Sequence, residues 1–297
     1  MPKLDDRADL AAALAATTGM RIAERPEGAV GGGSINECVR WPSESGPLFV
    51  KLTDATRHEM FAAEAEGLRE LERARAVRVP RVLGEGTAAG RAFLALEWIE
   101  FGRSSPRSEA LLGEQLAALH RVTARQFGWH RDNTIGATPQ RNDWLPDWPA
   151  FYARQRLGFQ LDLAAQHGHG GRWLDSGRRL CERISGFFDG YRPQPSLLHG
   201  DLWGGNWATD ASGAPVLYDP AVYFGDRETD LAMTTLFGGF GAAFYEAYDA
   251  AWPLDAGYAR RRDLYNLYHV LNHLNLFGGG YRGQAERMIG RLTAEVA

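Results

Sequence analysis

The sequence predicts an α+β protein of two lobes: a small N-terminal lobe with an antiparallel sheet and one helix, and a larger, mainly helical C-terminal lobe. Three observations predict this fold class. The chain has 297 residues, more than one hydrophobic core usually holds. Strand patterns separated by glycines lie before residue 99, and apolar residues at helical spacing dominate after it. We therefore expect the lobes at residues 1–99 and 100–297.

The composition is that of a globular protein with small-molecule partners. Hydrophobic residues make up 44% and the formal net charge is −4, so neither nucleic acid nor an acidic membrane surface is an expected partner. No apolar run approaches the roughly 20 residues that cross a membrane. The two cysteines form no disulfide framework, and the acids before the N-terminal Ala-rich run favour a helix over a secretory signal. We expect a cytoplasmic protein, and the sequence does not set its oligomeric state.

The N-terminal lobe contains a glycine turn, a strand that ends in lysine and a helix with one charge on its apolar stripe. Gly33 and Ser34 close the turn, which can bring N–H groups close to an anion, although a plain loop is the commoner outcome. Lys51 ends an apolar strand. In the helix expected over 56–75, Glu64 is the only charge on the apolar stripe, so it needs a partner, and Lys51 is the candidate. The alternatives are a solvent-exposed lysine and a glutamate at the helix edge.

The remaining elements are expected in chain order. Strands are predicted over 77–83 and 92–99, with a hairpin turn at Gly84, Gly86 and Gly90. Helices are predicted over 108–126, 150–166, 172–191 and 264–275, with an ordered loop over 127–149. His120 falls on the inner face of its helix, where a hydrogen-bonded core residue is expected.

The central stretch of the chain runs from Leu197 to Asn206 and continues to Asp219. Two short apolar runs flank the polar turn 210–213, which predicts a β-hairpin. Asn206 enters this hairpin and Asp219 leaves it, so both are expected at its open end, with Asp201 on the loop leading in. Carboxylate and amide oxygens of this kind suit Mg²⁺.

These residues carry a family resemblance. His199-Gly200-Asp201, Asn206 and Asp219 resemble the H-x-D-x-x-x-x-N loop and the metal-binding Asp of kinase-like phosphotransferases. The longer string DPAVYFGDRETDLAMT, residues 219–234, is similar to the fructosamine kinase (ketosamine-3-kinase) family, a branch of the aminoglycoside-phosphotransferase-like kinases. Residues 238–240, 244–248 and 271–278 match as well, and the resemblance runs from about residue 22 to the C-terminus.

The resemblance implies a protein-kinase-like fold, ATP as phosphate donor and Mg²⁺ as metal. Asp201 would accept the proton of the substrate hydroxyl, and His199 would brace the loop. Asn206 and Asp219 would hold the metal, and Lys51 would clamp phosphate oxygens. Gly33 and Ser34 would contact the phosphates, and the backbone of Glu97 and Ile99 would contact the adenine. Glu64 would hold Lys51 in place. Asp230 would anchor the catalytic loop, although a simple N-cap is the alternative for this residue.

Three functions remain open at this point. The first is a ketosamine-3-kinase that phosphorylates the third hydroxyl of a sugar-derived ketoamine, free or on a glycated protein; the resemblance implies an unstable product that frees the amine. The second is another small-molecule kinase, acting on an aminoglycoside, choline, homoserine or a free sugar. The third is a nucleotide-binding pseudokinase, against which the joint presence of Lys51, Asp201, Asn206 and Asp219 argues.

The C-terminal region favours a neutral or weakly cationic acceptor. Residues 255–297 hold four acids against six arginines, whereas a polycationic aminoglycoside requires a carboxylate-lined pocket. Trp203 follows Asp201 by two residues, and an indole face suits the C–H face of a sugar. Tyr223 and Asn272 are the other expected acceptor contacts. The resemblance to bacterial members favours a ribulosamine over a fructosamine.

Overall fold

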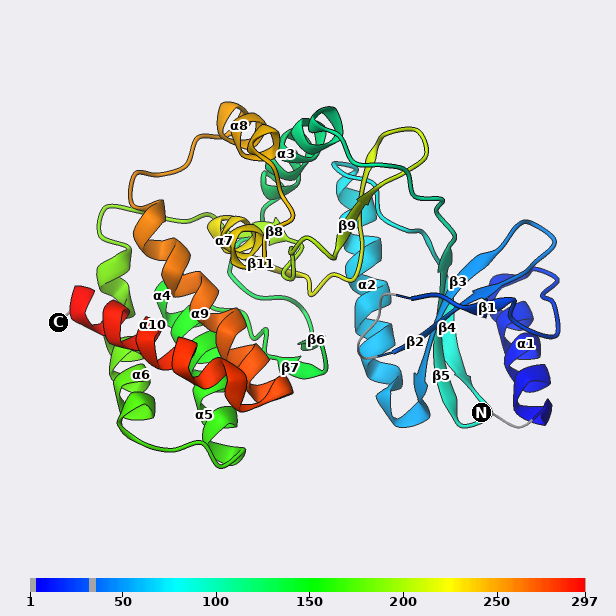
Figure 1. The fold of residues 1–297 in the computed structure, drawn as a ribbon, viewed down its shortest axis with the longest axis horizontal. Coiled ribbons are helices and arrows are strands. Elements are labelled where there is room, and N and C mark those ends of the chain that lie inside the picture. Colours follow the sequence, from blue (N-terminus) through cyan, green and yellow to red (C-terminus); the bar gives the residue numbers. More distant parts are fainter. Residues whose placement is uncertain (1–3, 32–35, 297) are drawn as a thin grey trace. The chain divides into compact units, whose positions relative to one another are not determined.

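The structure is a computed structural model that describes residues 4–31 and 36–296. The chain forms two compact units, residues 1–104 with 208–219, and residues 105–207 with 220–297 (Figure 1). The first unit therefore consists of the N-terminal 104 residues and a second segment, residues 208–219, from much later in the chain. Within the described ranges, no helix is both long and apolar enough to cross a membrane.

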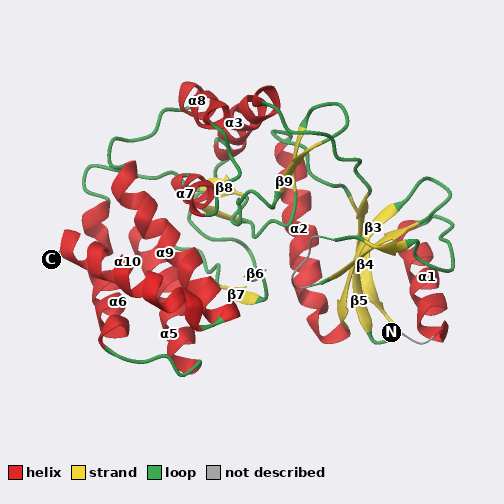
Figure 2. Cartoon of the chain, in the orientation of Figure 1, coloured by secondary structure: helices red, strands yellow, loops and turns green. Residues whose placement is uncertain are grey.

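The N-terminal unit is built on a five-stranded antiparallel sheet (Figure 2). Every neighbouring pair of strands is antiparallel, as predicted. In sheet order the strands are β1 (Gly28–Ala29), β2 (Glu37–Trp41), β3 (Leu48–Asp54), β5 (Arg91–Glu97) and β4 (Val82–Ala88). The short helix η1 (Ala55–Arg57) and the helix α2 (His58–Ala74) follow β3, close to the helix expected over 56–75.

The alternation of side chains along the strands gives the sheet two different faces. Val39 and Val50 point to one face, where they pack in a hydrophobic cluster with Leu10 and Leu14 of α1 (Leu4–Thr18). Residues one step along each strand point to the other face. Lys51 lies there, directly opposite Cys38 in the register of β2 and β3. The lysine therefore lies on the face that α1 leaves uncovered.

The boundaries of β4 correct the expected strand over 77–83. The strand runs through Gly84 and Gly86, which were expected in the turn, and the turn itself lies at Ala89 and Gly90. A Cβ at Gly84 would lie 2.4 Å from Thr17 Cγ2, and one at Gly86 would lie 3.0 Å from the Phe93 ring. These two glycines therefore serve close packing of α1 and β5 rather than chain reversal.

The hairpin predicted around residues 210–213 is present. Its strands are β9 (Trp207–Thr209) and β10 (Pro215–Leu217). A parallel bridge joins Arg78 to Val216, and the Leu217 amide donates to the Arg78 carbonyl at 2.9 Å. The Arg78 side chain also pairs with Asp210 in the hairpin turn. Through these bonds a segment from residues 208–219 becomes part of the N-terminal unit.

The C-terminal unit is mainly helical. Helix α3 (Pro106–His120) packs against α8 (Ala242–Ala251), and α9 (Tyr258–Phe277) packs against α7 (Glu228–Leu236) and α10 (Arg282–Glu295), which also contacts α6 (Arg172–Arg183). The helix expected over 150–166 is divided into α4 (Trp148–Phe151), a π-helical segment (Tyr152–Gly158) and α5 (Phe159–Gln166). The helices expected over 108–126 and 172–191 end earlier, the second continuing as η3 (Ile184–Phe187), and η4 (Gly279–Tyr281) links α9 to α10.

Two short β-pairs hold the loops of this unit. Strand β8 (Ser196–Leu198) leads to the loop 199–206 and pairs with β11 (Tyr223–Gly225). The loop predicted over 127–149 contains β6 (Asn133–Ile135) and β7 (Thr138–Gln140). The Asn133 side chain donates to the Val222 carbonyl at 2.8 Å, so this loop is fixed to the segment that follows Asp219.

Candidate active site

Lys51 lies between two carboxylates of the N-terminal unit. Its Nζ donates to Glu64 Oε1 at 2.6 Å and to Asp219 Oδ1 at 2.7 Å. Burial alone would lower the pKa of Lys51, but the charges of Asp219 and Glu64 raise it above its ordinary value. The amine therefore stays protonated. The contact with Glu64 is the one expected from helical periodicity, whereas the contact with Asp219 joins residues 168 positions apart.

Asp219 adopts a backbone conformation that is uncommon for a residue with a side chain. Its φ is 56°, in the left-handed region. The neighbouring strand β10 is fixed to Arg78, and Tyr218 stacks on Phe101 with ring centroids 5.6 Å apart. These contacts fix the chain on the N-terminal side of Asp219. Strained positions of this kind gather at functional sites.

The loop formed by residues 199–206 of the C-terminal unit is held through its backbone. Asp230, in the first turn of α7, accepts from the amides of His199 at 2.8 Å and Gly200 at 2.9 Å. Gly200 has a φ of 84°, and a Cβ there would lie 2.0 Å from the Ala221 carbonyl oxygen. The Ala221 amide in turn donates to the His199 carbonyl at 2.8 Å. Only glycine fits at position 200 without moving this backbone.

Asp230 is itself held by a buried chain of hydrogen bonds. His120 Nε2 lies 3.2 Å from Asp230 Oδ2, and His120 Nδ1 lies 2.8 Å from the Tyr248 hydroxyl. The Asp230 carboxylate can only accept, so His120 Nε2 donates to it, and the Tyr248 hydroxyl accepts a further hydrogen bond from Arg227 at 3.0 Å. Burial opposes ionisation of Asp230, but the bond from His120 leads the interactions that lower its pKa. The anchor of the loop is therefore a carboxylate.

Side chains within the loop orient Asp201. The Asn206 amide nitrogen donates to the Asp201 carbonyl at 2.8 Å and to its carboxylate at 3.2 Å. The Asp201 amide donates to His199 Nδ1 at 3.3 Å, so the hydrogen of the neutral imidazole lies on Nε2. His199 is fully buried. This geometry suits a bracing role for His199, with Asp201 as the carboxylate of the loop.

The other predicted nucleotide contacts are Gly33, Ser34, Glu97 and Ile99. Gly33 and Ser34 lie outside the described residues. Glu97 ends β5, where its amide donates to the Arg81 carbonyl and its carboxylate pairs with Arg78 at 2.8 Å. Its amide and its carboxylate are thus used within the unit. Ile99 is half-buried just after this strand.

Two predicted acceptor contacts are corrected by their burial. Tyr223 is 3% exposed, and its ring lies beneath the Arg156 guanidinium at 4.0 Å. Asn272 is also 3% exposed and accepts a hydrogen bond from Gln160. Both side chains are internal parts of the unit and offer no surface to a ligand. Trp203, by contrast, is 40% exposed.

Sequence reasoning placed His120 in the core but did not connect it to the catalytic loop. The helical periodicity placed His120 on the inner face of its helix, but it did not indicate which residues His120 contacts. The partners, Tyr248 and Asp230, are 128 and 110 positions away along the chain. The role of Tyr248 was missed altogether. Contacts across such separations leave no local pattern.

The predicted metal ligands have suitable chemistry. Asp219 supplies carboxylate oxygens. The Asn206 nitrogen faces Asp201, which turns its amide oxygen the other way. Such hard oxygen donors fit Mg²⁺. Among the described residues no three His, Cys, Asp or Glu side chains form a cluster that could hold a metal ion, so the remaining ligands would come from nucleotide phosphates and water.

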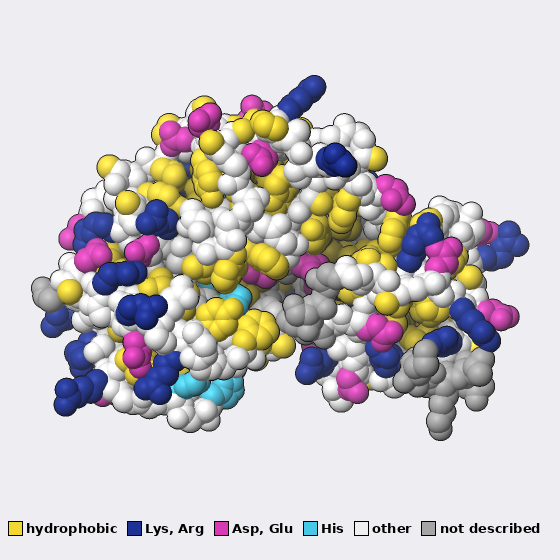
Figure 3. Space-filling view, viewed as in Figure 1, with side chains coloured by type: hydrophobic (Ala, Val, Ile, Leu, Met, Phe, Trp, Pro, Cys, Tyr) yellow, Lys and Arg dark blue, Asp and Glu magenta, His cyan; other side chains and the backbone are white. Residues whose placement is uncertain are grey.

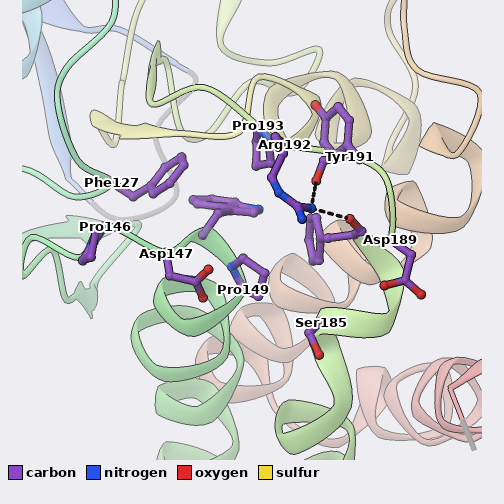
Figure 4. A pocket seen from close by; sticks show the side chains of 11 residues that line it. Phe127, Pro146, Asp147, Pro149, Ser185, Asp189, Tyr191, Arg192 and Pro193 are labelled. Atoms are coloured by element: carbon purple, nitrogen blue, oxygen red, sulfur yellow. Dashed lines mark hydrogen bonds between the residues drawn. The ribbon is translucent and has the colours of Figure 1, made fainter.

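A surface pocket in the C-terminal unit lies apart from these residues. It has a volume of about 350 Å³ and is lined by aromatic rings and prolines with Arg192 at its edge (Figure 4). The guanidinium donates to the carbonyls of Phe188 and Tyr191. The Asp147 carboxylate, also at the edge, caps α4 by accepting from the Ala150 amide. These two charged side chains therefore bond to nearby backbone groups. None of the predicted site residues lines the pocket.

The sequence of this chain is similar to those of known kinases. The profile of the fructosamine kinase family matches residues 7–295. A Synechocystis protein named as a probable ketoamine kinase is 46% identical over 281 residues, 94% of each chain. The chloroplastic protein-ribulosamine 3-kinase of Arabidopsis thaliana is 43% identical over 265 residues, which cover 88% of this chain and 81% of that protein.

Solved structures agree on the fold. A provisionally named fructosamine-3-kinase from Haemophilus somnus superposes with a TM-score of 0.86 at 30% identity, covering 96% of each chain. A macrolide 2′-phosphotransferase from Brachybacterium faecium reaches a TM-score of 0.58 at 16% identity over 98% of each chain, which shows the fold alone. The chain therefore belongs to the fructosamine kinase family and has the two-lobed α+β fold of protein-kinase-like phosphotransferases.

Proposed function

We propose that this protein is an ATP-dependent kinase that phosphorylates the 3-hydroxyl of ketosamines. The observation that carries the proposal is that the family match spans residues 7–295 and the chain keeps all four residues on which the chemistry rests, Lys51, Asp201, Asn206 and Asp219. The names of the relatives, ketoamine kinase and protein-ribulosamine 3-kinase, support the same substrate class.

The reaction is an in-line transfer of the γ-phosphoryl group. Asp201 orients the substrate hydroxyl and accepts its proton as the hydroxyl oxygen bonds to phosphorus, and the bond to the β-phosphate oxygen breaks to release ADP. Asn206 fixes the Asp201 carboxylate by its hydrogen bond of 3.2 Å. Because His199 and Gly200 are tied to Asp230, the loop reaches this geometry without reordering.

The donor half of the reaction uses the charged residues of the N-terminal unit. Lys51 carries the cation that neutralises phosphate oxygens, and Glu64 keeps it in place. Asp219 and Asn206 would hold Mg²⁺, which neutralises charge on the phosphates when bound. In the structure Asp219 also pairs with Lys51. We expect the lysine to exchange this partner for phosphate while it keeps Glu64.

The acceptor is a sugar-derived ketoamine, either free or on a lysine of a glycated protein. Trp203 is exposed two residues beyond Asp201, where its indole face can contact the C–H face of the sugar. The proposed role is repair, since loss of the phosphorylated sugar would return the amine. The proposed compartment is the cytoplasm, where ATP is abundant.

An acceptor screen with Mg-ATP tests the proposal. ADP release is measured with ribulose-lysine, fructose-lysine, free ribulose, choline and kanamycin, with Asp201→Asn as the background. We expect turnover with the two ketosamines, with ribulose-lysine preferred. Turnover of kanamycin with neither ketosamine would replace the proposal by an antibiotic kinase. Nucleotide binding without any turnover would favour a pseudokinase.

A further inference from the structure

An exposed group of aromatic side chains in the C-terminal unit adjoins the loop that carries Asp201. Three of the five exposed large hydrophobic side chains among the described residues belong to it: Trp203 at 40%, Phe237 at 44% and Phe277 at 56%. Figure 3 shows hydrophobic side chains gathered on the face of the unit that carries α9. Exposed aromatic groups of this kind mark binding surfaces more often than single exposed residues do.

The rings are arranged around one histidine. His273, near the C-terminal end of α9, lies 4.8 Å from Phe237, 5.4 Å from Phe277 and 5.2 Å from Tyr281 between ring centroids. We call Phe237, Phe277 and Tyr281 the His273 cage. Trp203 meets the cage edge-on, 6.3 Å from Phe237. The cage is therefore continuous with the loop that carries Asp201.

The hydrogen bond of His273 fixes its tautomer. His273 Nδ1 lies 2.8 Å from the His269 carbonyl oxygen, and a carbonyl can only accept, so Nδ1 carries the hydrogen. Burial lowers the pKa of His273, which keeps the ring neutral. The second nitrogen, Nε2, then has a lone pair and acts as an acceptor. The cage thus holds a hydrogen-bond acceptor framed by aromatic rings.

This combination suits an ammonium group. A cation is attracted to aromatic faces, and an ammonium N–H donates to an imidazole lone pair. The nearby Arg282 does not compete for the cage, since its guanidinium pairs with Glu286 at 2.9 Å. A negatively charged or apolar ligand would leave the Nε2 lone pair without a donor. The charge of Asp201, on the adjoining loop, also favours a cation here.

We propose that the His273 cage binds the ammonium nitrogen of the ketoamine acceptor, with an N–H donating to His273 Nε2. The inference rests on the proposed function and deepens it: the protein would distinguish a ketosamine from the free ketose by this nitrogen. A site built to receive a hydrogen bond rejects a ligand that lacks the donor. His273 is thus a specificity-determining residue, not a participant in phosphoryl transfer.

The first test compares two acceptors that differ in the nitrogen. Ribulose-Nα-acetyl-lysine and free ribulose are each measured as substrate or competitive inhibitor, giving KM or Ki. His273→Phe keeps an aromatic ring without the acceptor nitrogen. We expect it to raise the ketosamine KM about tenfold or more, while the ribulose constant, the ATP KM and kcat at saturation stay within about twofold. His273→Gln, which restores an acceptor oxygen, should recover part of the loss.

A second variant guards against misfolding. Phe277 is exposed, so Phe277→Ala should fold as the wild type and raise the ketosamine KM severalfold by removing one wall. Trp144→Ala is the matched control, since Trp144 is also 40% exposed in the same unit but lies outside the cage. If folded His273→Phe and Phe277→Ala leave the ratio of the two acceptor constants unchanged, the inference is wrong.

A binding measurement separates this inference from the proposed function. If the wild type phosphorylates no ketosamine, the proposed function fails, and the cage is then judged by NMR line broadening of N-methylbutylammonium. Broadening in the wild type and in Trp144→Ala, lost in His273→Phe, supports the cage. Equal broadening in all three proteins, or none in the wild type, overturns it.

Discussion

Lys51 and His269 are two equally buried bases, one in each unit, but Lys51 is charged and His269 is neutral. Each is 4% exposed. Two carboxylates bond to Lys51 and raise its pKa, so it stays charged. His269 has no hydrogen-bond partner on Nδ1 among the described residues, and burial lowers its pKa to about 3, so it stays neutral. Burial does not decide the charge; the partners do.

The two units also differ in how they hold the predicted site residues. In the N-terminal unit, charged side chains hold each other, and the arrangement can respond to a nucleotide. In the C-terminal unit, Asp230 holds the loop through the amides of His199 and Gly200, and a close backbone contact leaves no room at position 200. The first half should respond most to changes in charge, and the second to changes in volume.

The largest expected effect comes from the one residue of the loop that needs its charge. Asp201→Asn keeps the shape of the side chain but removes the proton acceptor, and we expect kcat to fall about 10²–10⁴-fold with little change in ATP binding. Steady-state kinetics with the best acceptor measures this. Asp175→Asn, at an exposed position of the same unit, is the control. If Asp201→Asn keeps more than about a tenth of kcat, Asp201 is not the base.

The second prediction concerns the space for a side chain at Gly200. Gly190, which has a similar φ value, is the control. Gly200 and Gly190 have φ values of 84° and 75°, but only Gly200 has a backbone oxygen in the way of a Cβ. Gly190→Ala should cost about 1 kcal/mol for the left-handed conformation. Gly200→Ala should cost about 2 kcal/mol more and lower activity. Urea unfolding measures both, and equal losses would show that the loop can relax.

Charge in the N-terminal unit is tested by a double-mutant cycle. Lys51→Met and Glu64→Gln should each weaken ATP turnover, and their effects should be non-additive by about 0.5–3 kcal/mol because the two side chains share one hydrogen bond. The cycle is measured as kcat/KM for ATP. Glu70→Gln, on the same helix, should combine additively with Lys51→Met. An additive result for Glu64 would mean that the ion pair has no part in ATP turnover.

The smallest expected effect concerns the neutral histidine. The folded-state pKa of His269 is below its ordinary value of about 6.5, so the unfolded chain binds the proton more readily and stability falls as pH drops below about 6.5. The contribution is complete above that pH and lost progressively towards pH 3. Relative to His269→Met, the wild type should lose about 2 kcal/mol between pH 8 and pH 5 in urea unfolding. Parallel pH profiles would contradict a neutral buried His269.

The sequence predicted what local patterns determine. Helical periodicity selected Glu64 as the partner of Lys51, and two apolar runs around a polar turn predicted the hairpin at residues 207–217. Both signals lie within one element or between neighbouring ones. The roles of Asp201, Asn206 and Asp219 are predictions that rest on the family resemblance.

What the sequence did not predict depends on distant partners. The sequence around Gly84 does not indicate that Thr17 packs against it. The pattern therefore predicts a turn at a glycine that lies within a strand. Tyr223 and Asn272 are expected acceptor contacts from residue type, because polar and aromatic side chains suit sugars, yet both are internal. Polar residue type does not distinguish a ligand contact from a buried hydrogen bond.

The position of the phosphate on the product is the most direct test of the proposed 3-kinase activity. The wild-type protein is incubated with Mg-ATP and ribulose-Nα-acetyl-lysine, and a ¹H–³¹P correlation spectrum is recorded before the product breaks down. We expect one new phosphate ester coupled to the proton on carbon 3 of the sugar, and we expect it to be absent with Asp201→Asn. Coupling to any other sugar carbon, or no ester from this acceptor while kanamycin is phosphorylated, would contradict it.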